Sequence, residues 1–205
     1  SSPGLQNDLN RDMNDTMRLQ MVNSNILGSI DFSRCILSKY NLSDFLSYDP
    51  AFSFDEVLAC QFLEIYFTRL QFKYPILDKN DVFSFHSYYT QINNKSLSST
   101  TSHDSHKNEK SSLLIFLQKF NMQNTWNTWK NSGNPIDYHY YCSRGWMIFA
   151  ISSCLHKTSG KYKGLPPNRY FSTAIRHLAK CSDQLDSWKK LEILSLSLQY
   201  IIRTD

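Results

Sequence analysis

Cysteine and histidine are the side chains in this sequence best able to bind a metal or attack a substrate. The cysteines are Cys35, Cys60, Cys142, Cys154 and Cys181. None lies within three residues of another, so the sequence contains no Cys-x-x-Cys metal or redox motif. Each cysteine stands among apolar neighbours, which predicts buried, reduced thiols. The sequence therefore predicts neither a metal site nor a cofactor site within this chain.

The histidines do not form a recognisable catalytic pattern. His103 and His106 stand in a Ser-rich stretch without further metal ligands, which predicts ordinary solvated side chains. His156 and His177 are expected near helix C-termini, where positive charge is favourable. His139 and Cys142 lie one helical turn apart, which alone is a weak sign of a base and a nucleophile. Phosphate-loop, Gly-x-Ser-x-Gly and His-Glu-x-x-His motifs are absent. The sequence therefore favours a non-catalytic protein over a helical hydrolase or transferase.

Aromatic residues make up 14% of the chain and offer a candidate binding site. An apolar cavity between helices is predicted to be lined by Tyr74, Trp146, Phe149, Tyr170 and Phe171. Packing of the same rings in an ordinary core is the alternative. The net charge of +4 is too small to indicate a nucleic-acid surface on this chain.

The elements that would position these residues are predicted to be helices. Apolar residues recur at helical spacing, and no segment alternates with a period of two. Helices are expected at about 54–72, 112–130, 137–156, from Pro166 onward, and at 186–203. The segment Ser53-Phe-Asp-Glu56 has the pattern of a capping box that starts the first of them.

Helix 137–156 is apolar nearly all round and is expected at the centre of the fold. The helix at 186–203 is expected to face the core through Trp188, Leu191, Leu194, Leu198, Ile201 and Ile202. The predicted fold is all-α: a multi-helix bundle of antiparallel helix pairs, loosely repeat-like.

The composition along the chain predicts its organisation. Residues 1–24 are polar and are expected to form a linker or an N-terminal helix, followed by a helical domain at 25–205. Within it, residues 91–112 hold Leu97 as their one large apolar residue after Ile92, which predicts a mobile Ser-rich loop. The longest apolar run is far shorter than the ~20 residues of a membrane span. The absence of an initiator Met leads us to expect a piece of a longer chain.

Several segments resemble a known family in the right order. Glu64-Ile-Tyr-Phe-Thr-Arg-Leu-Gln-Phe-Lys-Tyr-Pro-Ile-Leu-Asp-Lys-Asn-Asp81 resembles the start of the regulatory middle homology region of fungal binuclear zinc-cluster (Zn2Cys6) transcription factors. Trp146–Ser153 is similar to its central apolar helix, and Tyr170–Ala174 to its next helix. Leu191–Tyr200 is similar to the Leu-rich helix that follows. The resemblance covers roughly residues 54–203.

The resemblance implies a regulatory region that works in the nucleus. It implies control of transcription through a small-molecule effector or a co-regulator protein, with a homodimer as a further expected assembly. The zinc cluster and the contact with DNA would lie outside this chain, because its cysteines are not closely spaced. A structural dimerisation scaffold of a centromere-type zinc-cluster DNA-binding protein is the alternative.

Overall fold

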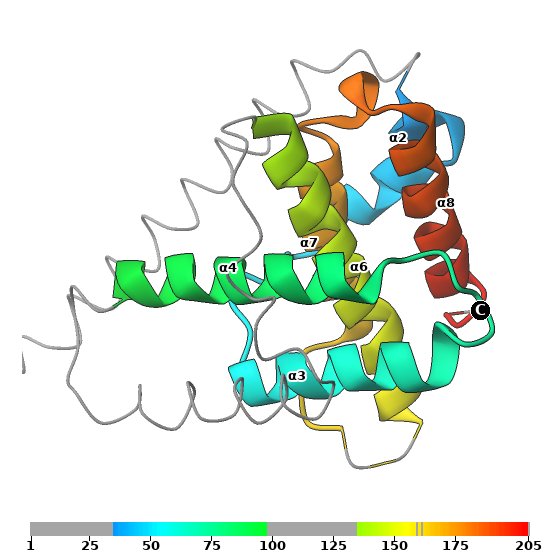
Figure 1. Cartoon of the computed structure of the whole chain (residues 1–205). Helices are drawn as coiled ribbons and strands as arrows, with labels where there is room; N and C mark the ends of the chain where they lie inside the picture. Colours follow the sequence, from blue (N-terminus) through cyan, green and yellow to red (C-terminus); the bar gives the residue numbers. More distant parts are fainter. Residues whose placement is uncertain (1–34, 98–134, 159, 161, 205) are drawn as a thin grey trace, which may run out of the picture.

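Every regular element of the described chain is helical. The computed structural model describes residues 35–97 and 135–204, apart from 159 and 161 (Figure 1). The α-helices are α2 (Ile36–Lys39), α3 (Glu56–Ile65), α4 (Lys79–Leu97), α6 (Pro135–Lys157), α7 (Pro167–Leu178) and α8 (Ser187–Ile201). Three further helical elements accompany them: the 3-10 helices η1 (Leu42–Ser47) and η3 (Ser182–Gln184) and the π-helix η2 (Tyr66–Leu70). The all-α prediction is confirmed for these residues.

The first long helix starts differently from the predicted capping box. Its N-cap is Asp55, whose carboxylate accepts the backbone N–H of Leu58 at 2.8 Å. Ser53 is not the cap, and Glu56 does not reach back to the N-terminus. The side chain of Glu56 is buried instead, because partners on another helix satisfy its carboxylate. α3 then continues into η2, so the predicted helix at 54–72 is present with shifted ends.

The next helix extends into the segment where the sequence predicts a loop. The carboxylate of Asp78 accepts the N–H groups of Asn80 and Asp81 and so caps the start of α4. α4 continues to Leu97, so residues 91–97 are helical although the sequence predicted a loop there. Adding residues to an existing helix costs little, which explains this extension into polar sequence. The rest of that loop, the predicted helix at 112–130 and the segment 1–24 lie outside the described residues.

α6 is the centre of the fold, as predicted. It packs against α3, α4, α7 and α8. Its segment Trp146–Ile151 is fully buried. α7 lies beside α6 and runs in the opposite direction, and α8 then returns in the direction of α6 (Figure 1). The predicted antiparallel helix pairs are therefore present. Among the described residues, no helix is both long and apolar enough to cross a bilayer.

The predicted core face of the helix at 186–203 is wrong for four of its six residues, whereas Leu194 and Ile201 are partly buried against the core. Trp188, Leu191, Leu198 and Ile202 are between 54% and 65% exposed. The buried residues of α8 are Glu192, Ile193, Leu196, Ser197, Gln199 and Tyr200. Apolar residues occur on several sides of this helix, so periodicity alone does not select the buried side. Long-range contacts select it, since the Tyr200 ring stacks on the Phe171 ring of α7 at 4.0 Å between centroids.

Candidate functional site

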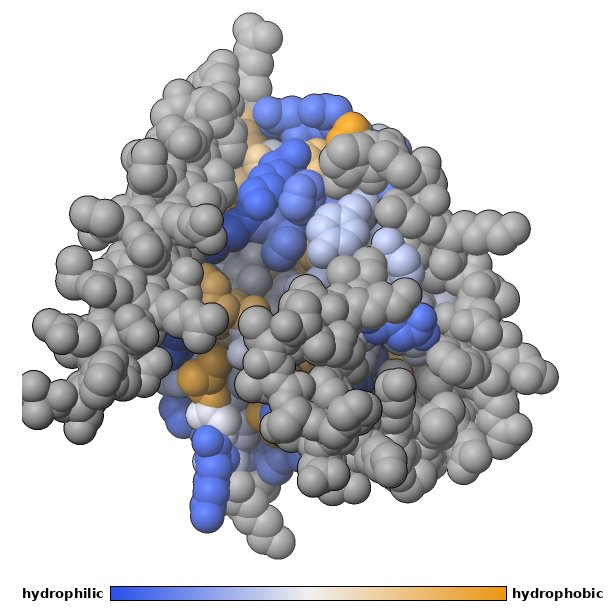
Figure 2. Space-filling view, turned by 90° about the vertical axis from the view of Figure 1, so that its left-hand side faces the viewer, coloured by the Kyte–Doolittle hydropathy of each residue, from blue (hydrophilic) through white to orange (hydrophobic). Residues whose placement is uncertain are grey.

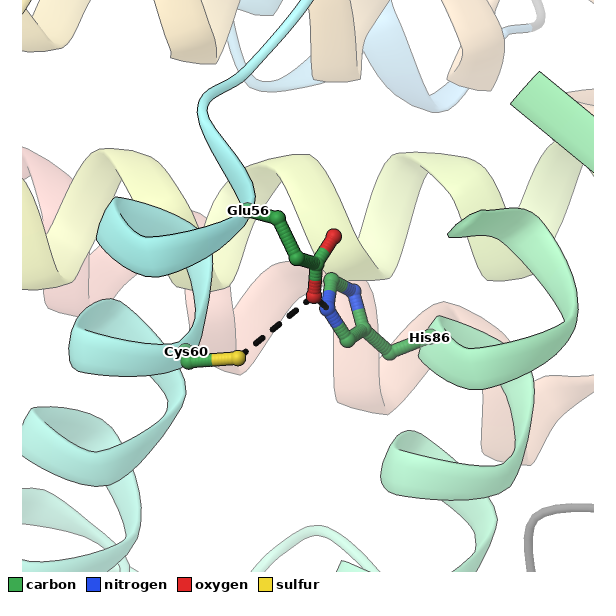
Figure 3. Close-up of side chains that lie close together, drawn as sticks. All are labelled: Glu56, Cys60 and His86. Atoms are coloured by element: carbon green, nitrogen blue, oxygen red, sulfur yellow. Dashed lines mark hydrogen bonds and ion pairs between the residues drawn. The ribbon is translucent and has the colours of Figure 1, made fainter. Parts of the chain in front are cut away.

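A buried polar cluster links the start of α3 to the middle of α4. It consists of Glu56 and Cys60 from α3 and His86 and Thr90 from α4, and we call it the Glu56 cluster. Each pair is four residues apart, so each pair lies on one face of its helix. In Figure 3 the side chains of Glu56 and Cys60 point from one helix toward His86 on the other.

Glu56 is the acceptor at the centre of this cluster. Its Oε1 lies 2.8 Å from His86 Nε2 and accepts the Cys60 thiol at 3.4 Å. Its Oε2 accepts the hydroxyl of Thr90 at 2.9 Å. Both carboxylate oxygens therefore have partners, although water has little access to them. This arrangement offsets much of the free energy needed to bury a carboxylate.

The cluster favours a charged carboxylate and a protonated thiol. Burial alone would raise the pKa of Glu56, but the charge of His86 and the hydrogen bonds from His86, Thr90 and Cys60 outweigh burial and hold that pKa below its ordinary value. For Cys60, burial and the adjacent Glu56 both raise the pKa far above its ordinary value. At neutral pH, Glu56 is therefore ionised and Cys60 carries its proton.

A second polar group joins α4, α6 and α8 around the buried Arg144. Arg144 Nη1 lies 2.7 Å from Asp81 Oδ2 and 3.9 Å from Glu192 Oε2. Its guanidinium lies over the ring of Tyr141, 4.7 Å from the centroid. The hydroxyl of Tyr140 donates to Glu192. Burial opposes the charge of Arg144, but Asp81 and its other partners outweigh burial and raise the pKa of this side chain.

A small cavity lies between these two polar groups. His86 and Arg144 are part of its wall, together with apolar side chains of α4 and α6 that include Trp146 and Phe149. The space open to a small molecule is about 20 Å³, enough for roughly one water. Sites for organic ligands typically measure about 300–1,000 Å³. In this conformation the cavity therefore fits a water-sized occupant.

The structure brings together three of the five residues predicted to line an effector pocket. The Trp146 ring lies 5.6 Å from that of Phe149 and stacks on that of Tyr170 at 6.1 Å. Phe171 lies elsewhere in the core, stacked on Tyr200. Tyr74 is 44% exposed at the turn after η2. An effector site at these residues stays a prediction.

The cysteines and the histidines His156 and His177 lie where the sequence predicts. All five cysteines are buried and free, as predicted. His139 faces His177 instead of Cys142, with 3.0 Å between the two Nδ1 atoms. Burial raises the pKa of the Cys142 thiol to about 12. No thiolate is therefore available for a His139–Cys142 pair at neutral pH. His156 and His177 lie in last helical turns, as predicted. For His177 the expected positive charge is wrong, because burial, His139 and Lys180 lower its pKa to about 3.

A larger concave surface lies beside α8. An open groove of about 550 Å³ is bounded by Ile36, Lys39, Tyr40, Ser182, Asp183, Lys190 and Leu194. It lies next to the exposed Leu191 of α8, because Lys190 is its neighbour in the chain and Leu194 follows it one helical turn later. Figure 2 views the molecule from the side away from α8, where the described residues at the surface mix hydrophilic and apolar types.

The two polar groups, around Glu56 and around Arg144, were not predicted from the sequence. Glu56 was assigned to a helix cap, and Arg144 and Glu192 were not singled out. A signal was present in the spacing of four between Glu56 and Cys60. Its partner His86 is 30 positions away, so only the packing of the helices reveals the cluster.

Comparison with known proteins gives one match. No protein-family model matches the chain, and no solved structure matches it. The chain is 42% identical over 180 residues to a Saccharomyces cerevisiae protein named "Uncharacterized transcriptional regulatory protein YLR278C". The alignment covers 87% of this chain and 12% of that relative. Over most of its length, the chain is therefore similar to one short segment of a transcriptional regulatory protein.

Proposed function

We propose that this chain is a non-catalytic regulatory region of a transcription factor and that it acts in the nucleus by binding a partner protein. The similarity to the yeast transcriptional regulatory protein over 87% of the chain carries this proposal. The zinc cluster and the DNA contact that the sequence resemblance implies would belong to other parts of the protein. The state of the buried groups agrees with a role without catalysis, because the thiols of Cys60 and Cys142 are held protonated.

The exposed side of α8 is the proposed contact surface. The exposed apolar residues are Trp188, Leu191 and Leu198 of α8 and its C-cap Ile202, and together they form what we call the α8 stripe. With Ser195 they follow the alternating spacing of three and four residues that pairs helices in coiled coils. An exposed apolar stripe of this kind fits the apolar face of another amphipathic helix. We therefore assign the α8 stripe to a helix of a co-regulator protein.

The groove beside the α8 stripe suggests the charge of that partner. Lys39 and Lys190 line the groove, against one carboxylate from Asp183. Acidic residues flanking the apolar face of the partner helix would meet this excess of positive charge. A small-molecule effector remains the alternative that the sequence suggested, and the water-sized cavity near Trp146 gives it no support.

A reporter experiment tests the proposal. The full chain is fused to an unrelated DNA-binding domain, and expression from a matching promoter is measured. We expect Leu191→Asp with Leu198→Asp to change reporter output, because charge on the stripe opposes helix pairing. Val57→Asp is the control, since Val57 is 44% exposed on α3, away from the stripe. Circular dichroism of the purified variants establishes that both are folded.

Two results would contradict this proposal. Equal reporter output from the stripe variant and the control would remove the α8 stripe from the regulatory surface. Light scattering that shows a dimer of the wild type, lost in the stripe variant, would assign the surface to a second copy of this chain instead. That result would favour the scaffold alternative.

A further inference from the structure

We propose that the Glu56 cluster is a binding site for one Zn²⁺ ion, held by Glu56, Cys60 and His86. A carboxylate oxygen, the thiol sulfur and an imidazole nitrogen of these residues all lie within 4.8 Å of one another. The three donors come from two helices, and all three side chains are buried. This site is independent of the proposed α8 surface and of any zinc bound elsewhere in the protein.

The distances are close to those of a tetrahedral zinc site. Zinc binds oxygen and nitrogen at about 2.0–2.2 Å and sulfur at about 2.3 Å, which separates neighbouring ligand atoms by roughly 3.3–3.7 Å. Glu56 Oε1 is 3.4 Å from Cys60 Sγ and 2.8 Å from His86 Nε2. The sulfur–oxygen distance already fits. Small rotations of the buried side chains would separate Glu56 Oε1 from His86 Nε2 by roughly half an ångström. They would also bring the Cys60 sulfur and the His86 ring nitrogen, which lie within 4.8 Å of each other, into the same range.

The donor types select among cations. A thiolate and an imidazole favour zinc or its spectroscopic substitute Co²⁺, whereas Mg²⁺ and Ca²⁺ prefer sites made only of oxygen ligands. Thr90 contributes from the next turn of α4, because its hydroxyl donates to Glu56 Oε2 at 2.9 Å and so orients the carboxylate. Three protein ligands leave a fourth position for a water.

The charges balance when the ion binds. Zn²⁺ brings two positive charges, which the Glu56 carboxylate and the Cys60 thiolate neutralise, and the Cys60 thiol proton is released to solvent. His86 offers Nε2 as its donor atom. Coordination to a metal deprotonates a thiol even where burial alone would prevent it.

Cobalt spectroscopy tests the site directly. The full chain is stripped of metal with a chelator and titrated with Co²⁺. We expect one equivalent to bind with visible bands typical of tetrahedral Co²⁺ and a near-ultraviolet band from a thiolate–cobalt bond. Cys60→Ser should lose the thiolate band. Cys154→Ser is the matched control, because Cys154 is also a buried free thiol but lies outside the cluster. Zn²⁺ should displace the cobalt and abolish both sets of bands.

Two further measurements protect the test against a variant that fails to fold. In the wild type, Zn²⁺ should slow alkylation of Cys60, located by peptide mass spectrometry, more than alkylation of Cys154. Zn²⁺ should also raise the melting temperature of the wild type and of Cys154→Ser, because it binds only the folded site. The proposal is overturned if no thiolate band forms, if Cys60→Ser retains it, or if Zn²⁺ protects both thiols equally.

Discussion

The hydrogen bond between Glu56 and His86 should couple the stabilities of α3 and α4. The two side chains are 5% and 7% exposed, and their atoms are 2.8 Å apart. Replacing Glu56 by Leu removes the acceptor of three buried donors. Replacing His86 by Leu removes the partner that most favours the carboxylate charge. We therefore expect each single variant to be strongly destabilised.

The magnitude follows from the burial of the pair. Breaking a buried ion pair by removing one partner typically costs about 3–5 kcal/mol, and each unsatisfied buried group costs roughly 1–3 kcal/mol. We expect a loss of about 3 kcal/mol for each single variant. Replacing both residues by Leu leaves no ionised carboxylate, so the double variant should lose about 1–3 kcal/mol less than the sum of the two single losses.

Urea unfolding followed by far-ultraviolet circular dichroism measures these free energies. The experiment is done with a chelator present, so that bound metal does not contribute. The single variants, the double variant and the wild type form a double-mutant cycle. Additive losses, with a coupling energy within experimental error of zero, would refute a direct interaction between Glu56 and His86.

Three further predictions use the same unfolding assay or a thiol assay. Trp146→Ala should lower the free energy of unfolding by roughly 3–5 kcal/mol, because its ring is buried among other rings. Trp188→Ala should lower it by under about 1 kcal/mol, because that ring is mostly exposed. Similar losses for the two variants would contradict the helix placements. The lowered pKa of His177 means that the unfolded chain binds a proton more readily than the folded chain. The free energy of unfolding should therefore fall by about 2 kcal/mol between pH 7.5 and pH 5, and His177→Phe should flatten this slope. An unchanged slope in the variant would contradict burial of a neutral imidazole. Burial raises the pKa of Cys142 and Cys181 to about 12, so both should resist a thiol reagent at pH 8 until urea unfolds the chain, and rapid reaction of the native protein would place them at the surface.

Periodic local patterns were enough to predict the helical class and the central helix. The segment Trp146–Ile151 is apolar on all sides, and such a segment is stable in water only when other helices cover it. The same argument predicted that the five thiols are buried. These properties depend on residues close together in the sequence, so the pattern itself carries the information.

The buried side of α8 and the partners of Glu56 required the tertiary structure. α8 has apolar residues on more than one side, and its orientation depends on Tyr140, which donates to Glu192 from 52 positions away. Glu56 has a suitable position for a helix cap, yet it turns inward because His86 lies there after folding. The sequence by itself thus determined which segments are helical and which helix must be covered. The tertiary structure decided which polar groups meet and which apolar face is left exposed, because those outcomes depend on contacts between residues far apart in the chain.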